Sequence, residues 1–432
     1  MKASLYILPT IFLAASCSSQ PSLPPIVHAQ PDATHIAVEL TNAERIDGKV
    51  LSFSNLGSYV RRGNPNLAAS RKLVDAAQGR LQAAGLRSNP TVEVEFEATP
   101  NLREPFLTAG IFRSFPRTNR LLLEKTVSAI LVESAQAEVA DAERLLIGKA
   151  REKLVQILAL KEKKQLLEKQ AANARELANF ITTAAERGEA SLLEAPTAEL
   201  EVAKLQTLTK QIEIQINLAE AKLKPLLGFA PAVDLSFAGS LPAIVLPPMQ
   251  VTVPRNRPDL VAARLQVKSA GERISLRQAE GLPDYDLGIF AGLGREVDEP
   301  EGGELEGIVG LRFSMPLGTD PKTPGNVREA QAERDRLDLS TLALRKVILA
   351  EVSAAHAEMT QWQKLAHRIE DELIPKARES LAQIRSAYRN GQIPLQNVLR
   401  AREQELSLQL TLLEALQNFH EARSRYLTAT NG

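Results

Sequence analysis

The sequence lacks several features that mark common protein classes. Its 432 residues include one cysteine, which excludes a disulfide scaffold and a metal centre built from several cysteines. Basic and acidic residues number 52 each, so no overall basic field favours nucleic-acid binding. Aromatic residues are only 4% of the chain, and the many Ala and Leu residues favour long helices over a bulky globular core. No run reaches 18 apolar residues after the N-terminus, so no membrane-spanning helix is predicted.

The N-terminus has the pattern of a secretory signal. Lys2 precedes a short apolar run, and small residues lead to the single cysteine, Cys17, so residues 1–16 are predicted to be a signal peptide. The segment Leu13–Ser16 resembles a bacterial lipobox, which implies acylation of Cys17, and residues 17–49 then form a lipidated tether. Ser18 after the cysteine goes with outer-membrane sorting in such lipoproteins. A chance cysteine in a plain signal peptide is the alternative.

The chain repeats itself once. Pro65 and Pro258 each open a helical segment, and the segments end at Pro90 and Pro283, at the same spacing, so two short helices of equal length are predicted. The predicted repeats are residues 50–240 and 241–432, together forming one domain.

Alternating residues follow each short helix. Strands are predicted over 91–98, 107–115, 285–293 and 307–315, with polar loops at 99–106 and 295–305. Strands of about nine or ten residues have the length of membrane β-strands, although a solvent-facing antiparallel sheet would show the same pattern.

Long helices complete each repeat. Residues 118–187 contain no proline and predict a helix of roughly 100 Å, whereas the second long helix, 326–389, contains Pro375, which must kink or break it. Glycine turns then lead to return helices at 193–226 and 395–428. A short helix and a return helix can stack end to end beside a long one. Because a barrel needs about eight strands, four strands per chain require oligomerisation, and three copies would supply twelve.

This arrangement resembles the TolC family of outer-membrane efflux channels over about residues 50–430. The resemblance rests on the borders Asn64-Pro65 and Arg257-Pro258-Asp259, on Ser314-Met315-Pro316-Leu317 and on the glycine turns; other segments look most like the cation-efflux (CzcC-like) branch. It implies a mainly α fold with a small β portion, in which long α-hairpins form an α-barrel and four strands per chain contribute to a trimeric 12-stranded β-barrel.

The resemblance also implies partners and site residues. The partners are the other copies of a homotrimer, a periplasmic adaptor (membrane fusion) protein, an inner-membrane pump of the RND type and outer-membrane lipid, with no nucleic acid. The α-barrel lies in the periplasm, and its tips dock the adaptor. Docking candidates, with glycines for the turns and an exposed apolar knob of leucines, are Gly188, Ala190, Leu192, Gly391, Ile393 and Leu395. The leucines could instead only staple the turns.

Gate and lumen residues follow from the same comparison. Tyr388 matches a gate tyrosine of the family; the other gate candidates are Glu194, Asn397 and Arg400, with Glu194 free to pair with Arg400 or Arg402. Glu93, Glu95 and Glu97 share a strand face and would set an acidic lumen that favours cations.

The sequence predicts no enzyme. No catalytic constellation, metal site, phosphate-binding loop or cofactor motif stands out, so transport energy must come from a partner. The predicted function is a passive duct that exports small molecules or metal cations from a tripartite pump. The alternatives are a type I-like secretion duct for proteins or peptides and a non-channel coiled-coil outer-membrane lipoprotein.

Overall fold

The computed structural model describes residues 50–98, 104–188, 191, 193–250, 252–298 and 302–430, so Cys17 and the predicted tether lie outside the described residues. The elements in chain order are β1 (Val50–Leu51), α2 (Leu56–Gly63), α3 (Pro65–Ala83), β2 (Thr91–Glu97), β3 (Phe106–Phe115), α4 (Arg120–Glu186), α5 (Glu194–Leu227), β4 (Ser236–Phe237), α6 (Pro258–Glu280), β5 (Tyr285–Asp298), β6 (Gly302–Ser314), α7 (Thr323–Arg368), a π-helical segment (Ile369–Leu373), α8 (Ile374–Arg389) and α9 (Leu395–Thr430).

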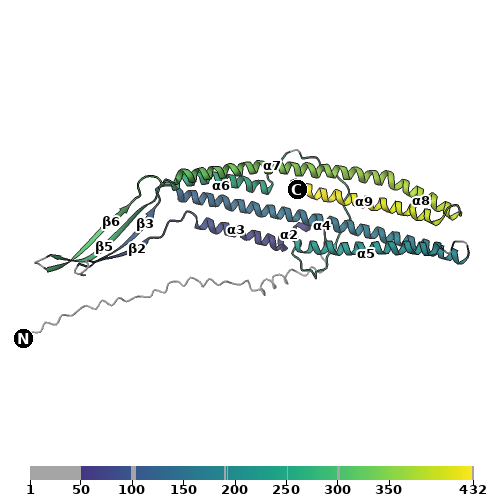
Figure 1. The fold of residues 1–432 in the computed structure, drawn as a ribbon, viewed down its shortest axis with the longest axis horizontal. Coiled ribbons are helices and arrows are strands. Elements are labelled where there is room, and N and C mark those ends of the chain that lie inside the picture. Colours follow the sequence, from purple (N-terminus) through teal and green to yellow (C-terminus); the bar gives the residue numbers. More distant parts are fainter. Residues whose placement is uncertain are drawn as a thin grey trace, which may run out of the picture. The chain divides into compact units, whose positions relative to one another are not determined.

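The helices form parallel columns around α4 (Figure 1). On one side α4 packs against α3 and α5, and on the other it packs against α6 and α9. Helix α7 packs on the far side of α6 and α9. Each short helix therefore shares a column with the return helix of its own repeat, as the sequence predicts.

The two end-to-end junctions are built from different residues. In the first repeat the Asn64 side chain accepts from Leu67 N at 3.0 Å, which caps α3, and donates to Leu226 O at 3.0 Å at the end of α5. Two glycines make the junction possible, because a Cβ on Gly63 would lie 2.2 Å from Leu227 O and one on Gly228 would lie 1.8 Å from Gly63 O. In the second repeat Arg257 takes the place of Asn64.

Two predicted lengths are wrong. The short helices are unequal: α3 has 19 residues and α6 has 23. Helix α3 ends early because the chain becomes extended at Ala84 and then takes a positive φ of 72° at Gly85. The predicted polar loop at 295–305 is also too long, since β5 and β6 stay paired up to Asp298 and Gly302.

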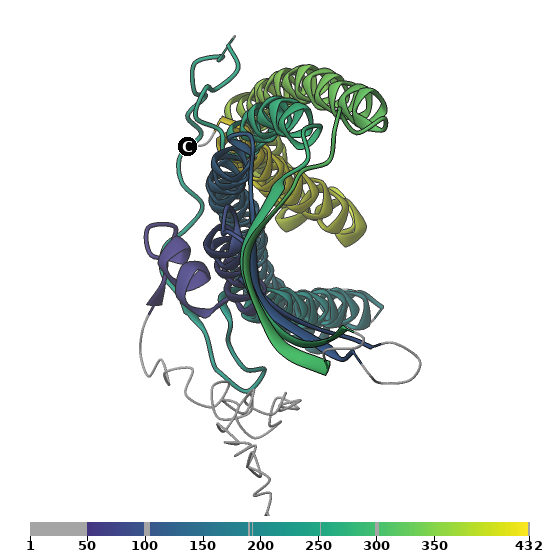
Figure 2. The same ribbon diagram turned by 90° about the vertical axis from the view of Figure 1, so that its left-hand side faces the viewer.

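The four long strands form one antiparallel sheet in the order β2-β3-β5-β6, so the two hairpins of the repeats pair through β3 and β5. The sheet is curved (Figure 2). Within the described residues, β2 and β6 are its edges, and each has a partner on one side only.

Three clusters of buried side chains hold the helices together. The first joins α4 to α2 and α5, the second joins the two hairpins toward their tips, and the third joins α7 to α9 beside the half-buried Trp362. None of the described helices carries an apolar stretch long enough to cross a membrane.

The second long helix is interrupted where the sequence predicts it. Helix α7 ends at Arg368, the segment Ile369–Leu373 is π-helical, and α8 follows with Pro375 in its first turn. The helical path continues through this segment. Pro375 lies in the first turn of α8, where its missing N–H is tolerated, and the wider π-helical turn directly precedes that turn.

Candidate functional site

The two faces of the four-stranded sheet differ in chemistry. One face carries apolar side chains on all four strands, and on the edge strands their exposed fractions run from 61% at Phe313 to 88% at Val309. At one end of this face, aromatic rings gather: Phe115 stacks on Tyr285 at 5.6 Å, and Tyr285 lies 5.7 Å from Phe313. A broad exposed apolar face of this kind needs lipid or protein to cover it.

The opposite, concave face is polar at its edges. The register places Glu93, Glu95 and Glu97 of β2 together on this face, all exposed, as the sequence predicts. Ser114 donates to Asp286 on the same face. Arg312 from β6 reaches across the sheet, and its Nη1 lies 3.2 Å from Glu93 Oε2. An ion pair between opposite edge strands shows that the sheet curves toward this face.

Phenyl rings cover the middle of the concave face, where the facing strands carry glycine. A Cβ on Gly288 would lie 2.1 Å from Phe112 Cδ1, and one on Gly310 would lie 2.4 Å from Phe290 Cζ. Phe106 lies in the same way over Gly294. The rings therefore lie flat against backbone and leave no room for other side chains at the glycine positions.

The hairpin tips lie at the far end of the long helices. Gly188 and Gly391 have positive φ values of 78° and 69°, which allow the tight turns predicted from the sequence. Ala190 and Leu192 lie outside the described residues. Ile393 is half-buried and lines a cleft of about 550 Å³ between the tips.

Leu395 is not an exposed knob. It is 1% exposed and packs into the cluster that joins the two hairpins, so it staples the turn, which was the alternative interpretation. Among the described residues near the first tip, Leu193 is an apolar side chain that is 80% exposed, and it is not one of the predicted docking candidates. The sequence prediction places Leu193 as the first residue of the return helix, whereas α5 begins at Glu194.

A hydrogen bond joins the two tips within one chain. Tyr388 Oη, in the last turn of α8, donates to Glu194 Oε2 at 3.0 Å, at the start of α5. Burial, together with the hydrogen bond and charge of Glu194, raises the pKa of Tyr388 to about 12, so the phenol stays protonated and remains a donor. The structure thus brings together two of the four predicted gate residues.

The other predicted gate residues lie elsewhere on the first turns of α9. Asn397 is half-buried and Arg400 is exposed. The suggested pairing of Glu194 with Arg402 is not the arrangement found, because Arg402 Nη1 donates to Asn173 O at 3.3 Å. Burial and nearby Arg385 lower the pKa of Arg402 to about 10.

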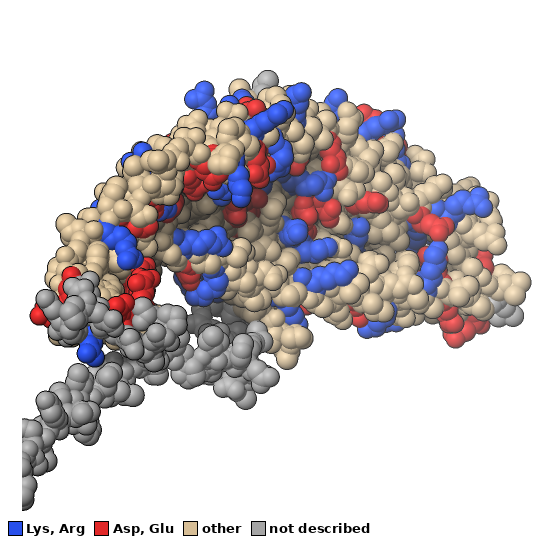
Figure 3. Space-filling model, turned by 60° about the vertical axis from the view of Figure 1, so that its left-hand side comes forward, with Lys and Arg blue, Asp and Glu red and all other residues tan. Residues whose placement is uncertain are grey.

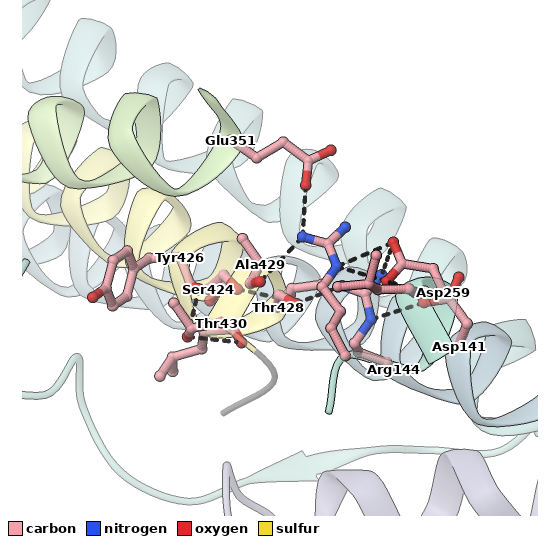
Figure 4. A network of polar contacts seen from close by, with 12 residues as sticks. Asp141, Arg144, Asp259, Glu351, Ser424, Tyr426, Thr428, Ala429 and Thr430 are labelled. Carbon is pink, nitrogen blue, oxygen red and sulfur yellow. Dashed lines mark hydrogen bonds and ion pairs between the residues drawn. The ribbon is translucent and has the colours of Figure 1, made fainter. Parts of the chain in front are cut away.

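Arg257, which the sequence marks only as a helix border, and Arg144 of α4 both contact the C-terminal end of α9. Figure 4 shows this network of polar contacts. Arg257 Nε lies 3.0 Å from Asp259 Oδ1, and its Nη1 lies 2.9 Å from Glu351 Oε2 and 3.1 Å from Ala429 O. Arg144 donates to Thr428 O and lies 2.6 Å from Asp141 Oδ1. The two side chains cap the last carbonyls of α9, a helix with no basic residue in its own last turn.

The linker between the repeats contacts α7 and α9, an arrangement that the sequence does not predict. His420 Nε2 lies 2.8 Å from Pro242 O, His356 Nε2 lies 3.1 Å from Pro247 O, and Tyr426 Oη donates to Pro248 O at 2.8 Å. Burial lowers the pKa of His420 to about 4. The prolines of this segment are visible in the sequence, but their partners lie 109 to 178 positions away along the chain.

The described residues do not point to a metal centre or a basic field. No three or more His, Cys, Asp or Glu side chains among them are arranged to hold a metal ion. Basic and acidic side chains alternate over the visible face, including its hollowed part (Figure 3).

Comparisons with known proteins give a consistent relationship. Residues 253–432 match the family described as outer membrane efflux protein. The chain is 25% identical over 297 residues to the pyoverdine export outer membrane protein OpmQ of Pseudomonas putida, which covers 64% of this chain and 61% of OpmQ. The chain therefore spans less than two thirds of that relative.

Solved structures share the fold. The outer-membrane channel OprN superposes with a TM-score of 0.72 at 18% identity, over 88% of this chain and 90% of OprN. CusC, the subject of a study of transmembrane channel formation, superposes with a TM-score of 0.72 at 15% identity, over 88% of this chain and 91% of CusC. Because each superposition covers 88% of this chain, the similarity of fold includes the first repeat, which the family match at residues 253–432 does not reach.

Proposed function

We propose, from the premise that this chain belongs to the outer membrane efflux protein family, that it forms the outer-membrane duct of a tripartite efflux system. As a family member the protein lies in the outer membrane. The observation that carries the proposal is the two-faced sheet, which presents apolar side chains outward and charged side chains on its concave side.

The apolar face of the sheet suits contact with lipid. The paired strands place Val94, Ala109, Ala291 and Val309 side by side on this face, with apolar neighbours above and below. The aromatic group around Tyr285 lies at one end, where membrane proteins place aromatic rings at the water boundary. Charged side chains on the other face then line water.

The open edges of the fold support a homotrimer. Among the described residues, no strand pairs with the outer sides of β2 and β6, and the backbone groups of such edges must be paired inside a membrane. The outer helices also expose large apolar side chains: Leu200, Ile214 and Leu218 on α5, and Leu339, Leu342 and Val347 on α7. Three copies joined edge to edge would pair these strands into a closed ring of twelve and cover these helices.

The tip residues support a gate and a docking surface. In the proposed duct, the bond from Tyr388 to Glu194 holds the second hairpin against the first and keeps the periplasmic entrance narrow. The turn residues around Gly188 and Gly391, together with the exposed Leu193, would meet a periplasmic adaptor protein that links the duct to an inner-membrane pump. Cys17 would carry the lipid anchor.

The proposed cargo is small molecules or metal cations. The relative OpmQ is named for pyoverdine export, which supports a small-molecule cargo. A duct has no site that must fit one substrate, so selection would reside mainly in the pump.

Conductance and export test the proposal together. The purified protein is expected to run as a trimer and to conduct ions in planar bilayers, and its deletion is expected to raise the cellular accumulation of at least one small molecule or metal. A monomer that does not conduct would contradict the duct. Loss of one secreted polypeptide with normal tolerance of metals and drugs would favour the secretion alternative.

The gate has its own test. Removing the hydrogen bond with Tyr388→Phe or Glu194→Gln is expected to increase the conductance of the isolated trimer, because the tips are then held less tightly. Tyr59→Phe is the matched control, since Tyr59 packs against Phe229 in a different part of the protein. Equal conductance in the native protein and all variants would refute the proposal that the Tyr388–Glu194 hydrogen bond keeps the entrance narrow.

A further inference from the structure

The concave face of the sheet carries an unusual basic side chain. Arg312 Nη1 lies 3.2 Å from Glu93 Oε2, and its Nη2 lies 4.0 Å from Glu95 Oε2. The guanidinium also lies over two phenyl rings, 4.8 Å from the centroid of Phe112 and 5.5 Å from that of Phe290. Arginine is the residue best suited to stack on aromatic faces while pairing with a carboxylate.

The rings that support Arg312 are themselves fixed. Phe112 lies against Gly288 and Phe290 lies against Gly310, so closely that a Cβ at either glycine would overlap the ring. A rigid aromatic floor keeps the guanidinium extended across the concave face. Its charge therefore stays above the sheet surface, although the long side chain could otherwise point toward either end of the strands.

The remaining charges on this face are acidic. The register places Glu93, Glu95 and Glu97 of β2, Asp286 of β5, and Glu304 and Glu306 of β6 on the same side as Arg312. Among the strand residues that the structure describes, Arg312 is the one basic residue on this face, since Arg113 and Arg295 pair with residues of the apolar face. The described strands of each chain would thus contribute a single positive charge to an otherwise acidic passage.

We propose that Arg312 determines the charge preference of the outer-membrane part of the duct, by offsetting the β2 glutamates and holding the preference for cations below what an acidic wall would give. The proposal rests on the proposed duct function. It sharpens the expectation of an acidic lumen, because the same glutamates are partly neutralised by a side chain fixed on an aromatic floor.

The expected effect has a sign and a size. Three copies would place three guanidinium groups around one passage, and Arg312→Gln would remove all three. Because water and salt screen charges in an open pore, we expect the permeability ratio of potassium to chloride to rise by about two- to three-fold. Glu93→Gln removes negative charge from the same contact and is expected to lower the ratio by a similar factor.

The experiment is a reversal-potential measurement on the full-length trimer in planar bilayers under a potassium chloride gradient. Arg312→Lys keeps the charge and is expected to hold the native ratio. Arg295→Gln is the matched control, because it removes the same charge from the apolar face of the same hairpin. It is also expected to leave the ratio unchanged.

The outcomes separate this proposal from the function on which it rests. Absence of conductance in the native protein would refute the duct itself. If the native channel conducts but Arg312→Gln has the same potassium-to-chloride permeability ratio, the role of Arg312 is overturned and the duct stands. The same holds if Arg295→Gln changes this ratio as much as Arg312→Gln does. If Arg312→Gln does not assemble, Glu93→Gln decides: an unchanged or raised ratio would overturn the proposal.

Discussion

Replacing Arg257 by Met tests how much the contacts of Arg257 at the junction of α6 and α9 contribute to the stability of the fold. Methionine keeps the apolar stem but removes the guanidinium, which is 5% exposed. Asp259, whose side chain is 17% exposed, would keep the Leu260 N–H at 2.8 Å and Arg144 at 3.8 Å, and the buried contact with Ala429 O would be lost. The partner Glu351 is 47% exposed, so solvent screens that contact and its share is small.

The free energy of unfolding should fall by about 3 kcal/mol, since breaking the buried ion pair removes the nearer guanidinium from the Asp259 carboxylate and the side-chain donor from the Ala429 carbonyl. The assay is urea unfolding of the detergent-solubilised protein followed by fluorescence. The chain has one tryptophan, Trp362 of α7, and it packs against the cluster that joins α7 to α9. Arg257 contacts both helices, through Glu351 of α7 and Ala429 O of α9. Glu351→Gln, as the comparison variant, should cost less than about 1 kcal/mol. A shift below about 0.5 kcal/mol for Arg257→Met would refute the reasoning.

Three further predictions concern other parts of the chain. Gly288→Leu should prevent Phe112 from lying against the sheet. Less of the proposed trimer should then be recovered from membranes, measured as the yield of the trimer band in unboiled samples on gels. His420 has a pKa of about 4 in the folded protein, so the stability that its neutral form contributes is complete above about pH 6.5 and is lost as the pH falls through 4. In urea unfolding, the free energy of unfolding should fall by about 3 kcal/mol over this pH window. His420→Gln should make the free energy of unfolding less dependent on pH. Gly63→Val should lower the urea midpoint because its side chain would collide with Leu227 O. The same change at the open Gly79, inside α3, should leave the midpoint unchanged or raise it slightly, because valine has a better helix propensity than glycine.

The repeat and its elements could be predicted because their signals are local. Proline at the first turn of α3 and α6, glycine at the two tips and alternation in the strands each act over a few residues. Strand β2 and helix α5 begin and end within one residue of prediction. The lengths that failed depend on contacts: α3 ends early at Gly85, and the pairing of β5 with β6 extends strands whose sequences look like loop.

The contacts of the candidate sites could not be predicted, because they join distant parts of the chain. Tyr388 and Glu194 belong to different hairpins and meet only when the four columns pack together. The pairing of Arg312 with Glu93 depends on curvature that strand patterns do not contain. For Leu395, the sequence left burial and exposure open, and packing between the hairpins decided for burial.

The π-helical turn before Pro375 keeps the second long helix in phase with its neighbours. Buried residues of this helix follow steps of three, four or seven up to Ile369, and the next buried residue is Ile374, five positions on. In a regular α-helix one extra residue would rotate everything beyond it by about 100°. The wider turn absorbs that residue, so the buried stripe continues and Tyr388 still faces Glu194. The π-helical turn that accommodates one inserted residue therefore sets the orientation of the tip, about four helical turns away.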